Sequence, residues 1–189
     1  AEHGDAGAAA EHGDARYLSN QSMAAAAVPG EGYLGNQSLH WYSCMDKCLD
    51  VKHGEAWNGN SIQLWQCYPG ELDQRFNIST AGPGLIRWTR YPEKCIQVRL
   101  DEQEVELFDC DESNDYQKFQ LSLDDSGQIR WSTHPDKCLD VTGGKTHNGN
   151  MVSLGHCDTQ AINQRFLAVN STAAPPYHGC RAKALDDID

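Results

Sequence analysis

Three copies of one unit fix the organisation of the middle of this chain. In each copy a tryptophan stands seven residues before a Cys-hydrophobic-x-Val unit, a second cysteine follows, and a Gln-x-Phe motif comes seven residues after that cysteine. The tryptophans are Trp41, Trp88 and Trp131, at spacings of 47 and 43 residues. Because several landmarks keep register through all three copies, the chain carries an internal triplication.

Each copy has the pattern of short β-strands separated by turns. In the segment SIQLWQC, Ile62 and Leu64 alternate with Gln63 and Trp65, so two apolar side chains face one way and two candidate binding side chains the other. Asn-Gly and Pro-Gly pairs mark the turns between such runs. The sequence therefore predicts an all-β protein. The repeat length would also suit propeller blades, but a propeller has at least four.

The motif set resembles the ricin B-type (R-type) lectin domains. The resemblance rests on Cys-Leu-Asp-Val, Gln-x-Trp, the second cysteine and Gln-x-Phe, and it covers about residues 36–170. It implies a β-trefoil of three repeats and twelve short strands with threefold pseudosymmetry. The expected division of the chain is a low-complexity N-terminal arm at 1–35, repeats at about 36–80, 81–123 and 124–170, and a C-terminal arm at 171–189.

The eight cysteines are expected to form four disulfides, because their number is even and their placing regular. The resemblance implies one bridge inside each repeat, which leaves one cysteine near each end of the domain to pair with the other. The expected pairs are Cys48–Cys67, Cys95–Cys110, Cys138–Cys157 and Cys44–Cys180.

An oxidising compartment follows from these disulfides, either the cell exterior or an organelle lumen such as the thylakoid lumen. The chain also carries four Asn-x-Ser/Thr sequons, as a secreted glycoprotein would. It begins at Ala1 with no signal sequence, so we expect it to be the processed form of a targeted precursor.

Several function classes are not expected. A net charge of −12 disfavours nucleic acid as a partner, and no apolar run approaches the length of a transmembrane span. Cys-x-x-Cys zinc spacing is absent, so neither a metal nor another cofactor is expected. The sequence has no nucleophile elbow, zinc-protease motif or phosphate-binding glycine loop, so we expect no enzymatic activity.

By resemblance, repeat one holds a carbohydrate-binding site for a galactose-type sugar. An aromatic face would stack on the apolar face of the sugar, while carboxylate and amide groups would fix its hydroxyls. The implied residues are Asp50, Gln63, Trp65, Asp73 and Gln74. The family usually has Asn at the position of Asp73, and a carboxylate there cannot donate a hydrogen bond and would repel Asp50.

The other two repeats match the binding pattern less well. Repeat three keeps Asp140, Asn163 and Gln164 as a weaker second site, but Gly155 stands where the stacking tryptophan should be. Repeat two is expected not to bind sugar. Gln97 and Glu106 replace the acid and amide there, and the Asn-Gly-Asn segment that would wall the pocket is missing.

A second function remains open. The decay of two sites would also suit a structural or interaction subunit, built into a larger protein assembly through residues 1–35 and 171–189. The lumenal side of a photosynthetic membrane complex is one example of such an assembly.

Overall fold

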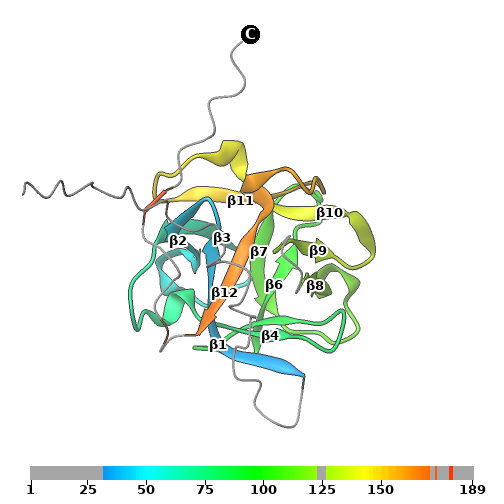
Figure 1. Ribbon diagram of the computed structural model, residues 1–189. Helices are drawn as coiled ribbons and strands as arrows, with labels where there is room; N and C mark the ends of the chain where they lie inside the picture. The colour runs from blue at the N-terminus through cyan, green and yellow to red at the C-terminus, as the bar shows by residue number, and fades with distance from the viewer. Residues whose placement is uncertain (1–31, 123–126, 171–172, 174–178, 181–189) are drawn as a thin grey trace, which may run out of the picture.

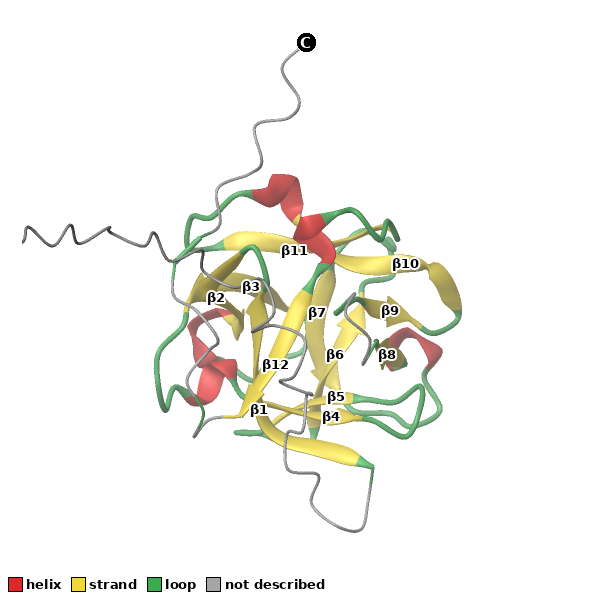
Figure 2. Ribbon diagram, viewed as in Figure 1, coloured by secondary structure: helices red, strands yellow, loops and turns green. Residues whose placement is uncertain are grey.

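The computed structural model describes residues 32–122, 127–170, 173, 179 and 180. Most of both arms, and with them the expected role of the arms in an assembly, lie outside the described residues. The strands wrap into a closed, barrel-like body, seen in Figure 1 and coloured by element type in Figure 2. None of the described helices is long and apolar enough to cross a bilayer.

Twelve β-strands occur in the described residues, as expected for a β-trefoil. In chain order they are β1 (Tyr33–Trp41), β2 (Cys44–Val51), β3 (Asn60–Gln66), β4 (Phe76–Ser79), β5 (Ile86–Trp88), β6 (Lys94–Val98), β7 (Val105–Asp109), β8 (Phe119–Leu121), β9 (Ile129–Trp131), β10 (His134–Val141), β11 (Asn150–His156) and β12 (Phe166–Asn170).

Short 3₁₀ turns complete the repeats. They are η2 (Lys52–Gly54), η3 (Leu72–Gln74), η4 (Asp115–Gln117), η5 (Thr142–Gly144) and η6 (Ile162–Gln164). The turns η3, η4 and η6 each end on the glutamine of Gln-x-Phe, so that the phenylalanine begins the next strand.

The landmark aromatics join the repeats to one another. The phenylalanine of each Gln-x-Phe motif lies opposite the tryptophan that opens the following repeat, and the last phenylalanine lies opposite the first tryptophan. The pairs are Phe76↔Trp88, Phe119↔Trp131 and Phe166↔Trp41. All six side chains are buried, which gives the threefold pseudosymmetry its physical basis.

The buried tryptophans keep their indole N–H groups satisfied. Trp88 Nε1 donates to the Leu72 carbonyl at 2.8 Å and Trp131 Nε1 to the Asp115 carbonyl at 2.9 Å. Trp41 Nε1 donates to the equivalent carbonyl of Ile162 at 3.2 Å. Each indole thus holds the 3₁₀ turn before Gln-x-Phe in place, as a buried tryptophan with a polar partner can.

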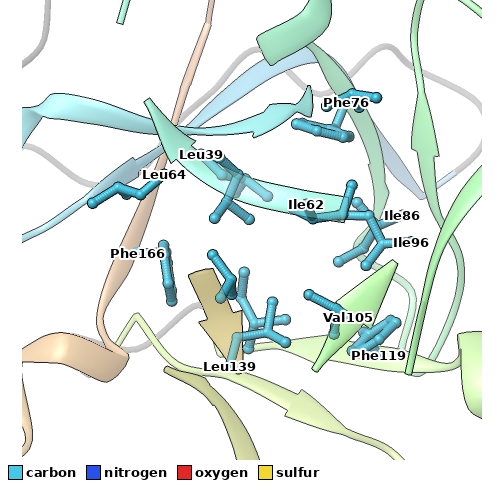
Figure 3. Close-up of a cluster of buried hydrophobic side chains, with 14 of the residues drawn as sticks. Leu39, Ile62, Leu64, Phe76, Ile86, Ile96, Val105, Phe119, Leu139 and Phe166 are labelled. Atoms are coloured by element: carbon cyan, nitrogen blue, oxygen red, sulfur yellow. The ribbon is translucent and has the colours of Figure 1, made fainter. Parts of the chain in front are cut away.

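The core is filled from the inner faces of the central hairpins, as Figure 3 shows for Ile62, Leu64 and Leu139. The expected alternation along β3 is confirmed, since Ile62 and Leu64 are buried in this cluster. Gln63 lies opposite Asp50, and Trp65 opposite Cys48, on the other face.

All four expected disulfides are formed: Cys44–Cys180, Cys48–Cys67, Cys95–Cys110 and Cys138–Cys157. His40 lies near the two sulfurs of Cys48 and Cys67, but these are bridged and cannot ligate a metal as thiolates. His40 Nδ1 instead lies 2.7 Å from the Met45 carbonyl oxygen.

Candidate functional site

The five residues expected to bind sugar in repeat one lie together. Asp50 on β2 faces Gln63 on β3 because the two are paired across the hairpin, while Asp73 and Gln74 arrive on η3. They line a pocket of about 160 Å³. Three lining residues were not predicted from the sequence, namely His53, Tyr68 and Glu71.

Asp50 is the hub of the pocket. Its Oδ1 accepts from Gln63 Nε2 at 2.9 Å and its Oδ2 from Gln74 Nε2 at 3.0 Å. Burial raises the pKa of Asp50 to about 6, against the two amide hydrogen bonds, and the charges of Asp73 and Glu71 raise it further. The carboxylate is therefore mostly ionised at neutral pH, and its remaining lone pairs can accept from ligand hydroxyls.

Gln74 holds Asp50 rather than presenting itself to a ligand. Its Oε1 accepts from the Tyr68 backbone N–H at 2.9 Å, and its Nε2 also donates to the Gln66 carbonyl at 2.8 Å. Gln117 and Gln164 make the same pair of backbone contacts in the other repeats. The glutamine of Gln-x-Phe is thus a buried clamp on the turn after each second cysteine.

Asp73 is paired in a way that the sequence did not reveal. Arg90 Nη1 donates to Asp73 Oδ1 at 2.8 Å. This cation supplies the positive partner that the expected repulsion with Asp50 would require. The Asp73 carboxylate also lies against Gly54, where a Cβ would have no room and where φ is +63°. Glycine at 54 and arginine at 90 together accommodate the acid.

His53 lines the pocket in a strained backbone conformation. Its φ of 58° and ψ of 9° lie in the left-handed region, and the equivalent residue of repeat three is Gly143. A side chain in this region costs energy that glycine avoids, although histidine tolerates it better than most residues. The strain is located at the pocket wall.

The Asn-Gly-Asn segments reach the next repeat, which corrects the expectation that each walls its own pocket. Asn148 Oδ1 accepts from the Gln66 backbone N–H at 2.9 Å, and Gly149 N–H donates to the Leu64 carbonyl at 2.9 Å. A Cβ on Gly149 would lie 3.9 Å from Trp65 Cζ3. Repeat three therefore borders the pocket of repeat one. By the same arrangement, the absence of an Asn-Gly-Asn segment from repeat two does not remove a wall from the candidate site of repeat two itself.

The polar residues of repeat three are gathered, but over a filled surface. Asp140 accepts from Asn163 Nδ2 and from Gln164 Nε2, each at 2.9 Å. A Cβ on Gly155 would lie 2.9 Å from Gln164 Nε2 and 3.0 Å from Asp140 Oδ2. These side chains lean over the glycine, so the aromatic platform has been replaced by polar packing.

The family of this chain is now established. The sequence model of the ricin-type beta-trefoil lectin domain matches residues 38–173, and the chain belongs to that family. A comparison with functionally curated proteins gave no significant match.

Solved structures show the same fold. The C-half of the earthworm R-type lectin, solved in complex with GalNAc, superposes with a TM-score of 0.60 at 18% identity, over 71% of this chain and 97% of that one. A designed threefold-symmetric protein, ThreeFoil, gives 0.61 at 21% identity, over 74% and 99%. The Rhizoctonia solani agglutinin gives 0.59 at 18% identity, over 72% and 94%.

Proposed function

We propose that the chain is a non-catalytic carbohydrate-binding module whose principal site is the pocket of repeat one. The observation that carries the proposal is the meeting of Trp65 with the buried carboxylate of Asp50 in one open pocket. An apolar ring face beside a fixed acceptor is the arrangement that a sugar ring requires. The lectin structure with bound GalNAc makes a galactose-type sugar the first ligand to test.

Each side chain has a distinct role in the proposed site. Trp65 stacks on the sugar ring, and Asp50 accepts from its hydroxyls. Gln63 uses its Nε2 on Asp50, so its Oε1 is left to accept from a hydroxyl. Asp73, held by Arg90, adds a further acceptor at the rim. The site is rich in acceptors and therefore suits a ligand that offers several hydroxyl donors.

The disulfides support a proposal about the compartment. Four disulfides indicate an oxidising environment, and we propose that the module acts on glycans outside the cytosol.

A glycan array with the disulfide-intact chain tests the proposal, followed by calorimetry on the sugar that binds. Trp65→Ala and Asp50→Ala should each weaken binding at least about tenfold, because each removes a main interaction. Leu100→Ala is the matched control, since this apolar side chain is 82% exposed in the short hairpin of repeat two. A parent chain that is folded but binds no glycan would refute the proposal.

A further inference from the structure

Trp57 is an exposed aromatic side chain whose indole N–H has a hydrogen-bond partner. It is 54% exposed, and its Nε1 donates to Glu55 Oε2 at 3.0 Å. The next residue, Asn58, is bound across the repeat boundary. Its Nδ2 donates to Asp109 Oδ2 at 2.8 Å, and its Oδ1 accepts from Lys94 Nζ at 2.7 Å. Tryptophan suits a binding surface because its ring offers a large apolar face while its N–H keeps a polar partner.

The indole and a carboxylate of the neighbouring repeat both lie close to Gly59. Gly59 N–H donates to the Leu107 carbonyl at 2.8 Å, which seats the loop on β7. The position that a Gly59 Cβ would take is 3.6 Å from Trp57 Cζ3 and 3.8 Å from Glu106 Oε2. Because φ of Gly59 is +91°, glycine also suits the backbone there. A residue with a side chain would fill the space between the ring and the carboxylate.

Glu106 is held by an amide as Asp50 is, with one hydrogen bond instead of two and with the acid and amide exchanged between the two strands. Gln97 Nε2 donates to Glu106 Oε1 at 3.2 Å, and Gln97 Oε1 accepts from Asn114 Nδ2 and Gln117 Nε2, both at 3.0 Å. The other oxygen, Oε2, forms an ion pair with Arg99 Nε at 3.9 Å, a distance at which no hydrogen bond uses its lone pairs. It can therefore accept from a hydroxyl placed over Gly59.

From this geometry we propose a second sugar-binding site at the boundary of repeats one and two. Trp57 provides the stacking face, Glu106 accepts from a hydroxyl, and Gly59 keeps the space between them open. The ligand class is a neutral pyranose sugar, which has both an apolar face and donor hydroxyls. The stacking residue, Trp57, lies in a loop of repeat one. The second site therefore does not need an aromatic residue at the strand position that Trp65 occupies in repeat one. Two sites on one chain would give it the bivalence that weak single sites need for avidity.

NMR on the ¹⁵N-labelled full chain tests this site apart from the repeat-one pocket. The background is Trp65→Ala, and the probes are methyl galactoside, N-acetylgalactosamine, methyl glucoside and methyl xyloside. The Trp57 indole N–H signal, assigned by its loss in Trp57→Ala, should shift saturably with at least one of them. Adding Glu106→Gln should weaken that affinity about tenfold, while adding Leu100→Ala should leave it unchanged.

Three results would overturn the inference. The Trp57 signal could stay in place with all four sugars, it could respond only when Trp65 is present, or it could respond with an affinity that Glu106→Gln does not change. None of these bears on the principal site, because binding that depends on Trp65 is measured separately in the parent chain.

Discussion

Arg90 Nη1 donates to Asp73 Oδ1 at 2.8 Å, so an arginine two residues after the tryptophan of repeat two pairs with an acid of the repeat-one pocket. The ion pair stands where the family usually has an amide. The positive charge of Arg90 allows Asp73 to line the same pocket as the carboxylate of Asp50.

Arg90→Ala should weaken sugar binding and raise the pKa of Asp50, because Asp73 would then repel Asp50 without a counter-charge. We expect a drop in affinity of about three- to tenfold at pH 7. Calorimetry and an NMR titration of the Asp50 carboxyl measure the two effects. The double variant Arg90→Ala with Asp73→Asn should restore both, and a double variant as weak as the single one would contradict the account.

Binding should strengthen as the pH rises through about 6. The pKa of Asp50 is raised to about 6, chiefly by burial. Below that value the protonated carboxyl offers one fewer acceptor, and above it the carboxylate accepts fully from ligand hydroxyls. Affinity measured from pH 4.5 to 8 should follow one titration step near 6. The step should vanish in Asp50→Asn, and its survival there would assign it to another group.

The three glutamines of Gln-x-Phe should be equivalent for stability and different for binding. Alanine at Gln74, Gln117 or Gln164 removes the side-chain partner of a part-buried backbone N–H and of a carbonyl, and each substitution should cost about 0.5–1.5 kcal/mol. Urea unfolding under oxidising conditions measures this. Of the three variants, Gln74→Ala alone should also weaken binding at the principal site, since Gln74 is the one of these three glutamines that donates to Asp50. Equal loss of binding in all three would mean that general destabilisation is the cause.

His53→Gly should stabilise the fold, because glycine adopts the left-handed conformation at this position without strain. The expected gain is about 0.5–1 kcal/mol in the free energy of unfolding, reduced by the greater entropy of glycine in the unfolded chain. Thermal unfolding provides the measurement. His53→Ala is the control and should bring no such gain; equal stability of the two variants would show that the backbone there is unstrained.

Gly155→Trp should not rebuild a site in repeat three. The new side chain would meet Gln164 Nε2 and Asp140 Oδ2, so the polar cluster must move first, at a cost of about 1–3 kcal/mol. Calorimetric stoichiometry with the array-selected sugar should be unchanged from that of the parent. An additional site per chain would show that only the aromatic was missing.

The fold could be predicted because its signals are local and repeated. The spacing of Trp41 to Cys48, repeated in each copy, revealed the triplication, and the family resemblance then predicted the twelve-strand β-trefoil and the four disulfides. The alternation of Ile62 with Gln63 gave the inner and outer faces of the hairpin correctly.

The rest of the site depends on contacts between repeats, which spacing within one repeat does not encode. Asn148 binds Gln66 across 82 residues of sequence, and Arg90 reaches Asp73 from the far side of a repeat boundary. Glu71 could have been found, since it lies two residues before Asp73 and is the third acid of the pocket beside Asp50 and Asp73.

The aromatic pairs between repeats have a consequence for how the molecule holds together. Phe76 pairs with Trp88, Phe119 with Trp131, and Phe166 with Trp41, so every repeat supplies one half of two contacts and completes neither alone. The three pairs form a closed cycle around the molecule, so no repeat is at an end of it. Its strands should form and melt as one unit, and a circular permutant opened at the boundary between Ser79 and Ile86 should keep the same fold.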